Sequence, residues 1–126
     1  MSDIAEVETI ARIYLEALHD GDADGLARVF APSSALYASI GGSATALGIE
    51  AWLDRVRNRK SARASGHEAR NAIHAIEVVG DMALVKVSSA FPPNRFTDFL
   101  SLVRTADGWR IVAKTYHVEA APEQSL

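Results

Sequence analysis

The sequence predicts one α+β domain in which helices come first and an antiparallel sheet follows. Two observations support this class. Apolar residues recur at the helical period of about 3.6 as far as Lys60, and from Arg70 onward they alternate with a period of two, as strands require. The length of 126 residues fits a single domain with one substantial core. We therefore expect residues 1–126 to form one domain with its helices on one side of the sheet.

Two helices are expected at the start of the chain. The first spans residues 4–18, whose apolar side chains lie on one face, and Asp3 can cap its start. Gly21 is a natural stop, because glycine adopts the left-handed conformation that ends many helices. A short second helix is expected to begin near Asp22 or Ala23 and to end at Pro32-Ser33-Ser34, where proline interrupts the helical hydrogen bonds.

Five strands are expected, one before the third helix and four after it. The first covers residues 35–40 and ends at Gly41-Gly42, and the third helix follows at about residues 48–60. Small residues at 61–66 connect this helix to the sheet, and the tail from about residue 120 is expected to be loose. The other four strands form a meander whose turns contain glycine or proline: Ala72–Val79, Met82–Ala90, Arg95–Arg104 and Gly108–Glu119.

Composition argues against several kinds of function. The net charge of −3 and the pI near 5.8 do not favour binding to nucleic acid or to an anionic membrane. The chain has no cysteine, which excludes disulfides and thiol catalysis. Its four histidines lack the spacing of a metal motif, so neither a metal nor a cofactor is expected. No secretory signal and no membrane-spanning apolar run is visible, so a cytoplasmic location is expected.

Asp98 is the residue that departs most from its surroundings. In the expected strand at 95–104 it shares a face with Phe96, Leu100 and Leu102, although aspartate is disfavoured in strands. An unpaired carboxylate that is buried costs several kcal/mol, so Asp98 either lines a pocket or pairs with a cation. The candidate cations are Lys114, Arg110 and Arg70.

The order of these elements resembles the nuclear transport factor 2-like superfamily, which shares its cone-shaped fold with ketosteroid isomerase. Residues 13–31, which begin Ile13-Tyr14-Leu15-Glu16, look like the first two helices of that fold. Residues 96–102 and 108–117 are most similar to the branch labelled "putative lumazine-binding". The resemblance covers about residues 6–118 and implies a cystatin-like roll, in which three helices pack on a strongly curved sheet.

Ketosteroid isomerase uses a tyrosine and a protonated aspartate as an oxyanion hole, and a second aspartate as base. The resemblance places Tyr14 and Asp98 at the first two positions. The position of the base falls on Ala38, which cannot move a proton, so steroid isomerisation is not expected. From its position on the apolar face of the first helix, Tyr14 could equally be a hydrogen-bond donor in a pocket or a core tyrosine whose hydroxyl bonds to the backbone.

Other candidate site residues follow from the expected faces of the strands. His117 shares strand parity with Trp109 and could act as a base beside Asp98 on the inner face, or it could be an exposed histidine near the strand end. His74 is expected on the inner face with Ile76. The candidate catalytic residues are therefore Asp98 and His117. The expected ligand-binding residues are Tyr14, Tyr37, Trp52, His74, Phe96, Asp98, Leu100, Trp109 and His117.

Two surface features have both a structural and a functional interpretation. The basic segment 55–63 is either a solvated helix face or a patch that binds an anion. The sheet carries apolar residues on both faces, with Phe99, Val103, Val112 and Tyr116 expected on the outer one. Because three helices can cover only one face, a homodimer through the outer face is expected.

The function that best fits these observations is small-molecule binding in an apolar pocket anchored by Asp98 and Tyr14. Whether the chain is an enzyme stays open. The alternative is a proton-transfer enzyme, such as an isomerase, dehydratase or cyclase, that uses Asp98 or His117. A second alternative is a non-catalytic interaction module. The expected partner is an unidentified small apolar or aromatic ligand, and only the branch label implies a lumazine-like or flavin-like one.

Overall fold

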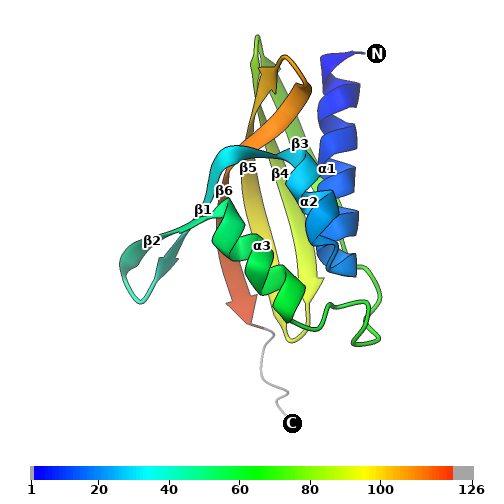
Figure 1. Cartoon of the computed structure of the whole chain (residues 1–126), viewed down its shortest axis with the longest axis vertical. Coiled ribbons are helices and arrows are strands. Elements are labelled where there is room, and N and C mark those ends of the chain that lie inside the picture. Colours follow the sequence, from blue (N-terminus) through cyan, green and yellow to red (C-terminus); the bar gives the residue numbers. More distant parts are fainter. Residues whose placement is uncertain (1, 121–126) are drawn as a thin grey trace.

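The computed structural model describes residues 2–120, which form helices and strands in a single layered unit (Figure 1). The tail predicted to be loose lies almost wholly outside these residues. The helices are α1 (Asp3–Asp20), α2 (Ala23–Val29) and α3 (Ile49–Asn58). The strands are β1 (Phe30–Ile40), β2 (Ser43–Gly48), β3 (Ala72–Val79), β4 (Met82–Phe91), β5 (Asn94–Thr105) and β6 (Gly108–Ala120).

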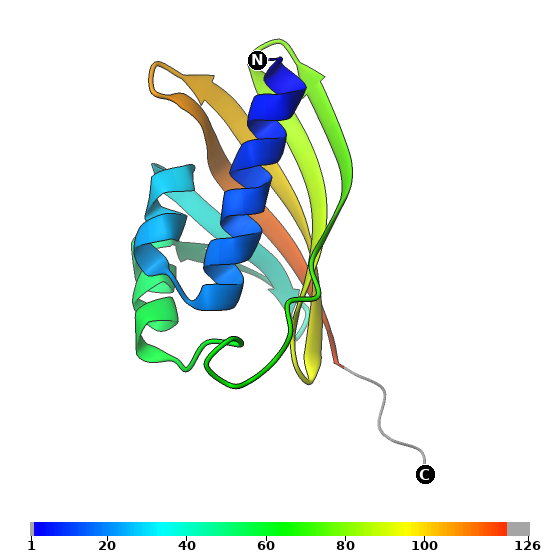
Figure 2. The same ribbon diagram turned by 90° about the vertical axis from the view of Figure 1, so that its right-hand side faces the viewer.

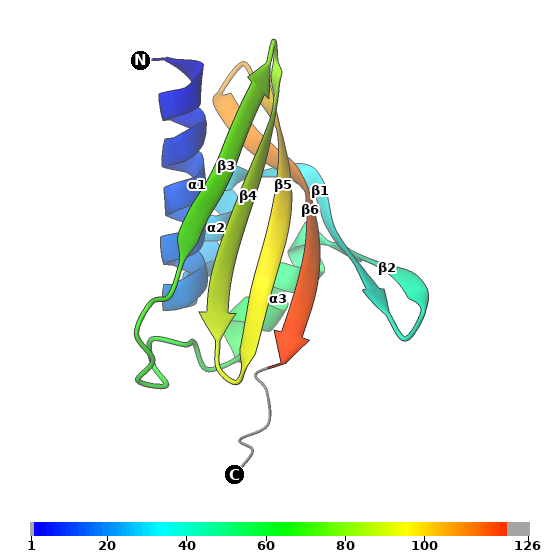
Figure 3. The same ribbon diagram turned by 180° about the vertical axis from the view of Figure 1, so that it is seen from behind.

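All of these strands belong to one sheet with the order β2-β1-β6-β5-β4-β3. Neighbouring strands run antiparallel, except that β1 and β6 run parallel. Figure 2 shows that the sheet is curved and that the helices lie on its concave side. From behind, in Figure 3, the convex side carries no helix. The predicted α+β class, with three helices on one face of a curved sheet, is confirmed.

The start of the sheet differs from the prediction. β1 begins at Phe30, not at residue 35. Its pairing with β6 is irregular between Phe30 and Ala35, and this irregular stretch accommodates Pro32. β2 was not predicted at all. Gly41 and Gly42 have φ of 58° and 81°, so they form a two-residue hairpin turn rather than only ending a strand.

A β-bulge in β6 decides which of its side chains face the helices. The pairing with β5 skips Val112, so the alternation of faces is reversed beyond that residue. Ile111 is buried before the bulge, and Lys114 is buried after it, with Tyr116 packed against the core on the same side. His117 is exposed. The predictions that His117 faces inward and that Tyr116 faces outward are therefore wrong.

A second bulge, in β3, places His74 away from the inner face. The pairing of β3 with β4 shifts between Ile73 and Ala75, which makes His74 the extra residue. Its side chain is exposed, and its Nε2 lies 2.8 Å from Ser88 Oγ. The prediction that His74 lies on the inner face is wrong because the bulge interrupts the alternation on which it relied.

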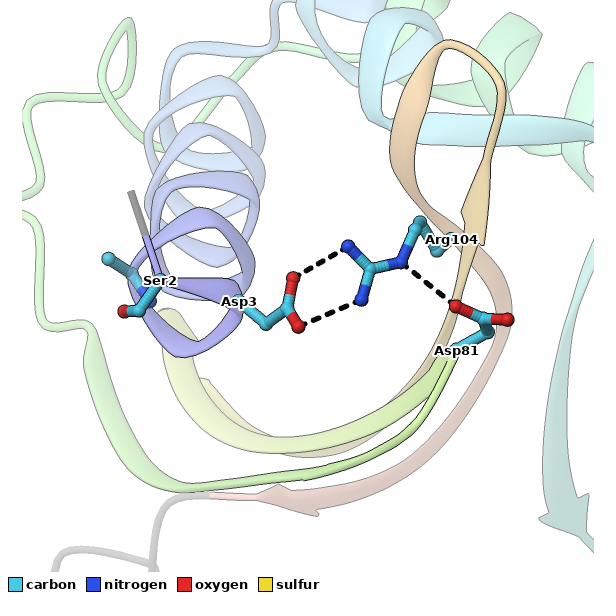
Figure 4. A network of polar contacts seen from close by, with 5 residues as sticks. Ser2, Asp3, Asp81 and Arg104 are labelled. Carbon is cyan, nitrogen blue, oxygen red and sulfur yellow. Dashed lines mark hydrogen bonds and ion pairs between the residues drawn. The ribbon is translucent and has the colours of Figure 1, made fainter.

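The N-terminus of α1 is tied to the sheet by a polar network (Figure 4). Ser2 caps the helix by accepting a hydrogen bond from the Ala5 backbone N–H, in place of the predicted cap by Asp3. Asp3 instead accepts hydrogen bonds of 2.7 and 2.8 Å from the Arg104 guanidinium, which also donates to Asp81 at 2.9 Å. These bonds from Arg104 lower the pKa of the Asp3 carboxyl.

The core lies between the helices and the inner face of the sheet. Phe30, at the start of β1, makes edge-on contacts with the rings of Tyr14 and Trp52, with centroids 5.8 and 5.6 Å apart. These contacts join α1 and α3 across the sheet. The largest side chains with no more than 2% exposure include one carboxylate among apolar groups: Tyr14, Leu26, Leu53, Leu100, Leu102, Ile111 and Asp98.

Candidate functional site

A cavity of about 470 Å³ opens at the end of the cone where α1 ends and the β4–β5 turn lies. Its apolar wall combines four aromatic side chains with smaller apolar ones: Trp52, Phe91, Phe96 and Tyr116, together with Leu18, Leu47, Ala62, Ala90, Pro92 and Pro93. Polar groups interrupt this wall at a few points: His19, Arg55, Arg59, Asn71, Ser89, Asn94 and Lys114. Apolar walls with a few convergent polar groups are typical of small-molecule sites.

Lys114 is a charged residue that lies between this cavity and the core. It lines the cavity, yet its side chain is only 7% exposed. Its Nζ lies 4.5 Å from the centroid of the Trp52 ring and 5.3 Å from the centroids of both Tyr14 and Tyr116. Aromatic faces stabilise a nearby cation, but they do not replace the hydrogen bonds that an ammonium group makes in water.

Asp98 and Tyr14 form a hydrogen-bonded pair beneath Lys114. The Tyr14 hydroxyl donates to Asp98 Oδ2 at 2.6 Å, and both side chains are fully buried. Lys114 Nζ lies 3.8 Å from the same oxygen, which is an ion-pair distance but too long for a hydrogen bond. Asp98 Oδ1 has no hydrogen-bond partner among residues 2–120. The carboxylate is therefore held mainly by the tyrosine.

The environment changes the ionisation of two members of this group. Burial lowers the pKa of the Lys114 amine; Asp98 opposes this effect, and the positive charge of Arg59 adds to it. Burial also raises the pKa of the Tyr14 hydroxyl well above its usual value, and the Asp98 charge and hydrogen bond raise it further. Tyr14 thus remains a proton donor at neutral pH, while Lys114 loses its proton more readily than an exposed lysine.

Some residues of the basic segment 55–63 line the cavity, and others lie on the surface of the protein. Arg55 and Arg59 line the cavity, and the Arg59 guanidinium lies 5.5 Å from the centroid of the Phe91 ring. Arg57 instead pairs with Asp54 on the surface of α3. The lining residues include no aspartate or glutamate, so every permanently charged group on the cavity wall is cationic.

The structure brings together only part of the predicted site. Trp52 and Phe96 line the cavity. Tyr14 and Asp98 do not line it, but both lie beside Lys114, which does. Leu100 is a fully buried core residue that does not line the cavity.

Four predicted ligand-binding residues lie away from the cavity. Tyr37 is 45% exposed, because its neighbour Leu36 occupies the inner position on β1. Trp109 lies under the Arg104 guanidinium, at the end of α1 opposite the cavity. His74 and His117 are exposed because of the bulges in β3 and β6.

Lys114 appeared in the sequence only as a possible ion partner for Asp98. Strand parity counted from Trp109 places it on the outer face. The segment Ile111-Val112-Ala113 contains the signal that was missed, because three consecutive apolar residues break the alternation of a half-buried strand and indicate a bulge.

Replacing Tyr14 by phenylalanine is expected to lower the free energy of unfolding by about 1 to 3 kcal/mol. The change removes the only hydrogen bond to the buried Asp98 carboxylate among the described residues. Urea unfolding followed by circular dichroism measures the effect. Tyr116→Phe is the control, because Tyr116 is partly exposed and its hydroxyl makes no such bond. Equal losses in the two variants would contradict the prediction.

Residues 2–120 contain no group of three histidine or acidic side chains placed to hold a metal ion. No described helix is both long and apolar enough to cross a membrane.

The chain is similar to several known proteins along most of its length. A curated relative, named aldolase FrzH, from a Cladobotryum species, is 25% identical over 118 residues, which cover 92% of this chain and 91% of that protein. A solved NTF-2 like protein of unknown function from Silicibacter pomeroyi has a TM-score of 0.81 and 25% identity, with 92% and 95% of the two chains covered.

The fold extends to more distant proteins. A ketosteroid isomerase-like protein from Erwinia carotovora atroseptica has a TM-score of 0.73 at 15% identity, with 94% and 98% of the chains covered, which shows the shared fold alone. A family model described as "Putative lumazine-binding" matches residues 2–117. Together with the cone-shaped fold, this match shows that the chain belongs to the "putative lumazine-binding" family of the nuclear transport factor 2-like superfamily.

Proposed function

We propose that this protein binds a small, flat, aromatic anion in the cavity above Lys114. The observation that carries the proposal is the composition of the wall, in which aromatic side chains are combined with charged groups of one sign. Arg55 belongs to α3 and Arg59 follows its last residue, whereas Lys114 is buried between Trp52 and Tyr116. An acidic group on the ligand would meet the arginines, while its ring packs on the aromatic wall.

The name of the family supports a flat ring without identifying it, because lumazine is a fused aromatic heterocycle. Burial of such a ring contributes roughly 25 cal/mol for each Å² of apolar surface removed from water, and the arginines add selectivity for charge. Asp98 and Tyr14, the anchors predicted from the sequence, would act indirectly in this arrangement by holding Lys114 at the base of the cavity.

Binding of 4-(hydroxymethyl)benzoate, measured by titration calorimetry, tests this proposal. We expect the anion to bind more tightly than the neutral benzene-1,4-dimethanol. Arg59→Gln should weaken binding of the anion about five- to tenfold and leave the neutral compound unaffected, since it removes about 1 kcal/mol of charge interaction. Arg57→Gln is the matched control, because Arg57 pairs with Asp54 away from the cavity. Equal affinity for both compounds would contradict the proposed selectivity.

A second candidate function is proton-transfer or carbonyl chemistry at the same site. The observation that favours it is the group of Lys114, Asp98 and Tyr14, which contains an amine of lowered pKa beside a carboxylate. The relative named as an aldolase supports this class of reaction. His117, predicted as a base, is exposed on the outer face, so any acid–base pair would consist of Asp98 and Lys114. The open cavity gives less support to an interaction module, whose interior should be filled.

We also propose that the protein forms a homodimer through the convex face of the sheet. An outer patch of exposed apolar side chains supports this: Val79, Met82, Leu84, Phe99 and Val103. Val79, Met82 and Val103 are direct neighbours across β3, β4 and β5, so the patch is continuous there. Covering such a face removes apolar surface from water.

Light scattering at micromolar concentration is expected to give the mass of a dimer, and Val103→Lys is expected to give a monomer. A charged side chain within the outer patch cannot be buried without a large cost. Ile4→Lys, at an exposed apolar position on α1 outside this patch, should remain dimeric. A monomeric wild type would refute this mode of assembly.

A further inference from the structure

We propose that the Lys114 amine captures the carbonyl group of an aromatic, acidic aldehyde or ketone in the cavity and forms an imine with it. This proposal rests on the proposed function, because it names the reactive group of a ligand that the same cavity would hold. It also gives Lys114 a covalent role that a binding site alone does not require.

The geometry supports a nucleophilic role for the Lys114 amine. Lys114 reaches the cavity from β6, where Trp52 and Tyr116 lie beside its Nζ. No hydrogen bond holds this amine among the described residues, and the nearest carboxylate oxygen lies 3.8 Å away. The other two lysines of the chain, Lys60 and Lys86, are exposed and lie outside the cavity.

The charged and titratable groups around this amine come from several elements. Asp98 faces it from β5, Tyr14 from α1, Tyr116 from β6 itself, and Arg59 acts from the chain just beyond α3. Asp98 favours the ammonium form, but burial and the positive charge of Arg59 favour the neutral amine. Neutral amines are the form of lysine that attacks carbonyl groups, and desolvation in an apolar pocket is a known route to such activation.

The reaction needs no oxidant and no further reactant. Asp98 takes one proton from the ammonium group, and the freed lone pair of Nζ attacks the carbonyl carbon as the C=O π electrons move to oxygen. The resulting carbinolamine loses water, which carries away the carbonyl oxygen and the two remaining amine hydrogens. Asp98 then returns its proton to the imine nitrogen. The iminium withdraws electrons from the carbon next to it. This activates the bound compound for making or breaking a carbon–carbon bond at that carbon.

Reductive trapping with 4-formylbenzoate and sodium borohydride tests the proposal on the wild-type protein. Borohydride converts the imine to a stable secondary amine, which adds the mass of the aldehyde minus one oxygen atom. Peptide mapping is expected to find this adduct on Lys114 at least severalfold faster than on Lys60 or Lys86, because the cavity holds the aldehyde beside the Lys114 amine and burial lowers the pKa of that amine. Equal rates at the three lysines, or no adduct at Lys114, would overturn the proposal.

The controls separate this proposal from the proposed function. 4-(Hydroxymethyl)benzoate has no aldehyde or ketone carbonyl and so cannot form an imine. If it binds and 4-formylbenzoate gives no adduct on Lys114, imine formation is refuted while ligand binding stands. If it does not bind, the proposed function fails. In the expected case it slows labelling of Lys114 and leaves Lys60 and Lys86 unchanged. Lys114→Arg keeps the positive charge beside Asp98 and should abolish the cavity adduct in a folded protein.

Discussion

Replacing Asp98 by alanine is expected to lower the free energy of unfolding by about 3 to 5 kcal/mol at pH 7. Asp98 is fully buried, accepts the Tyr14 hydroxyl and is the nearest carboxylate to Lys114. Its removal leaves a buried amine without a counter-charge and a buried hydroxyl without an acceptor. Thermal unfolding followed by circular dichroism should show a fall in Tm of more than about 10 °C.

Two further variants identify the cause of that loss. Asp98→Asn keeps the size of the side chain and an acceptor for Tyr14, so it should cost less than Asp98→Ala and should affect ligand binding more than folding. The double variant Asp98→Asn with Lys114→Met removes both charges, and it should regain stability over Asp98→Asn because no unpaired charge is left in the core. If Asp98→Asn unfolds as early as Asp98→Ala with no effect on ligand binding, Asp98 has a purely structural role.

The second large effect concerns pH. Between pH 7 and pH 10, the wild type is expected to gain stability relative to Lys114→Met, with a slope of at most about 1.4 kcal/mol per pH unit. Burial lowers the pKa of Lys114 in the folded protein below the usual value of 10.5. Between these two pKa values the unfolded chain binds more protons than the folded protein, so a rise in pH favours folding.

Urea unfolding of both proteins at a series of pH values provides the difference curve, in which contributions common to both cancel. The series ends at pH 10, because the raised pKa of Tyr14 acts in the opposite direction above the usual value of 10.0. There the folded protein keeps a proton that the unfolded chain loses, and stability falls as pH rises. A difference curve that falls between pH 7 and pH 10 would show that Asp98 holds the ammonium form more strongly than burial disfavours it.

These two effects connect the binding and enzyme interpretations of the site. A site that only binds an anion gains from a permanently protonated Lys114, whereas imine formation needs the neutral amine for part of the time. The distance of 3.8 Å between Lys114 Nζ and Asp98 Oδ2 permits exchange of a proton after a small movement and does not fix the ion pair by a hydrogen bond. The pH series and the trapping experiment therefore both report on the equilibrium between the protonated and the neutral form of the Lys114 amine.

The sequence by itself determined the features that depend on local periodicity and on special backbone conformations. The apolar spacing of α1 and α3 follows the helical period, and Gly21 ends α1 at a φ of 68° that other residues rarely adopt. Alternation along β5 placed Asp98 on the buried face, because β5 keeps its register with β4 through that residue. These features were predicted correctly because each depends on residues close together in the chain.

Only the tertiary structure decided which groups meet in the cavity. The bulges at His74 and Val112 depend on how β3 and β6 pair with their neighbours, and each reverses the faces of the residues beyond it. In this way His117 moved to the outer face and Lys114 to the inner one. The pairing between strands, which sets this register, is made by residues far apart in the sequence. A count of alternating residues therefore found the buried carboxylate but not the amine beside it.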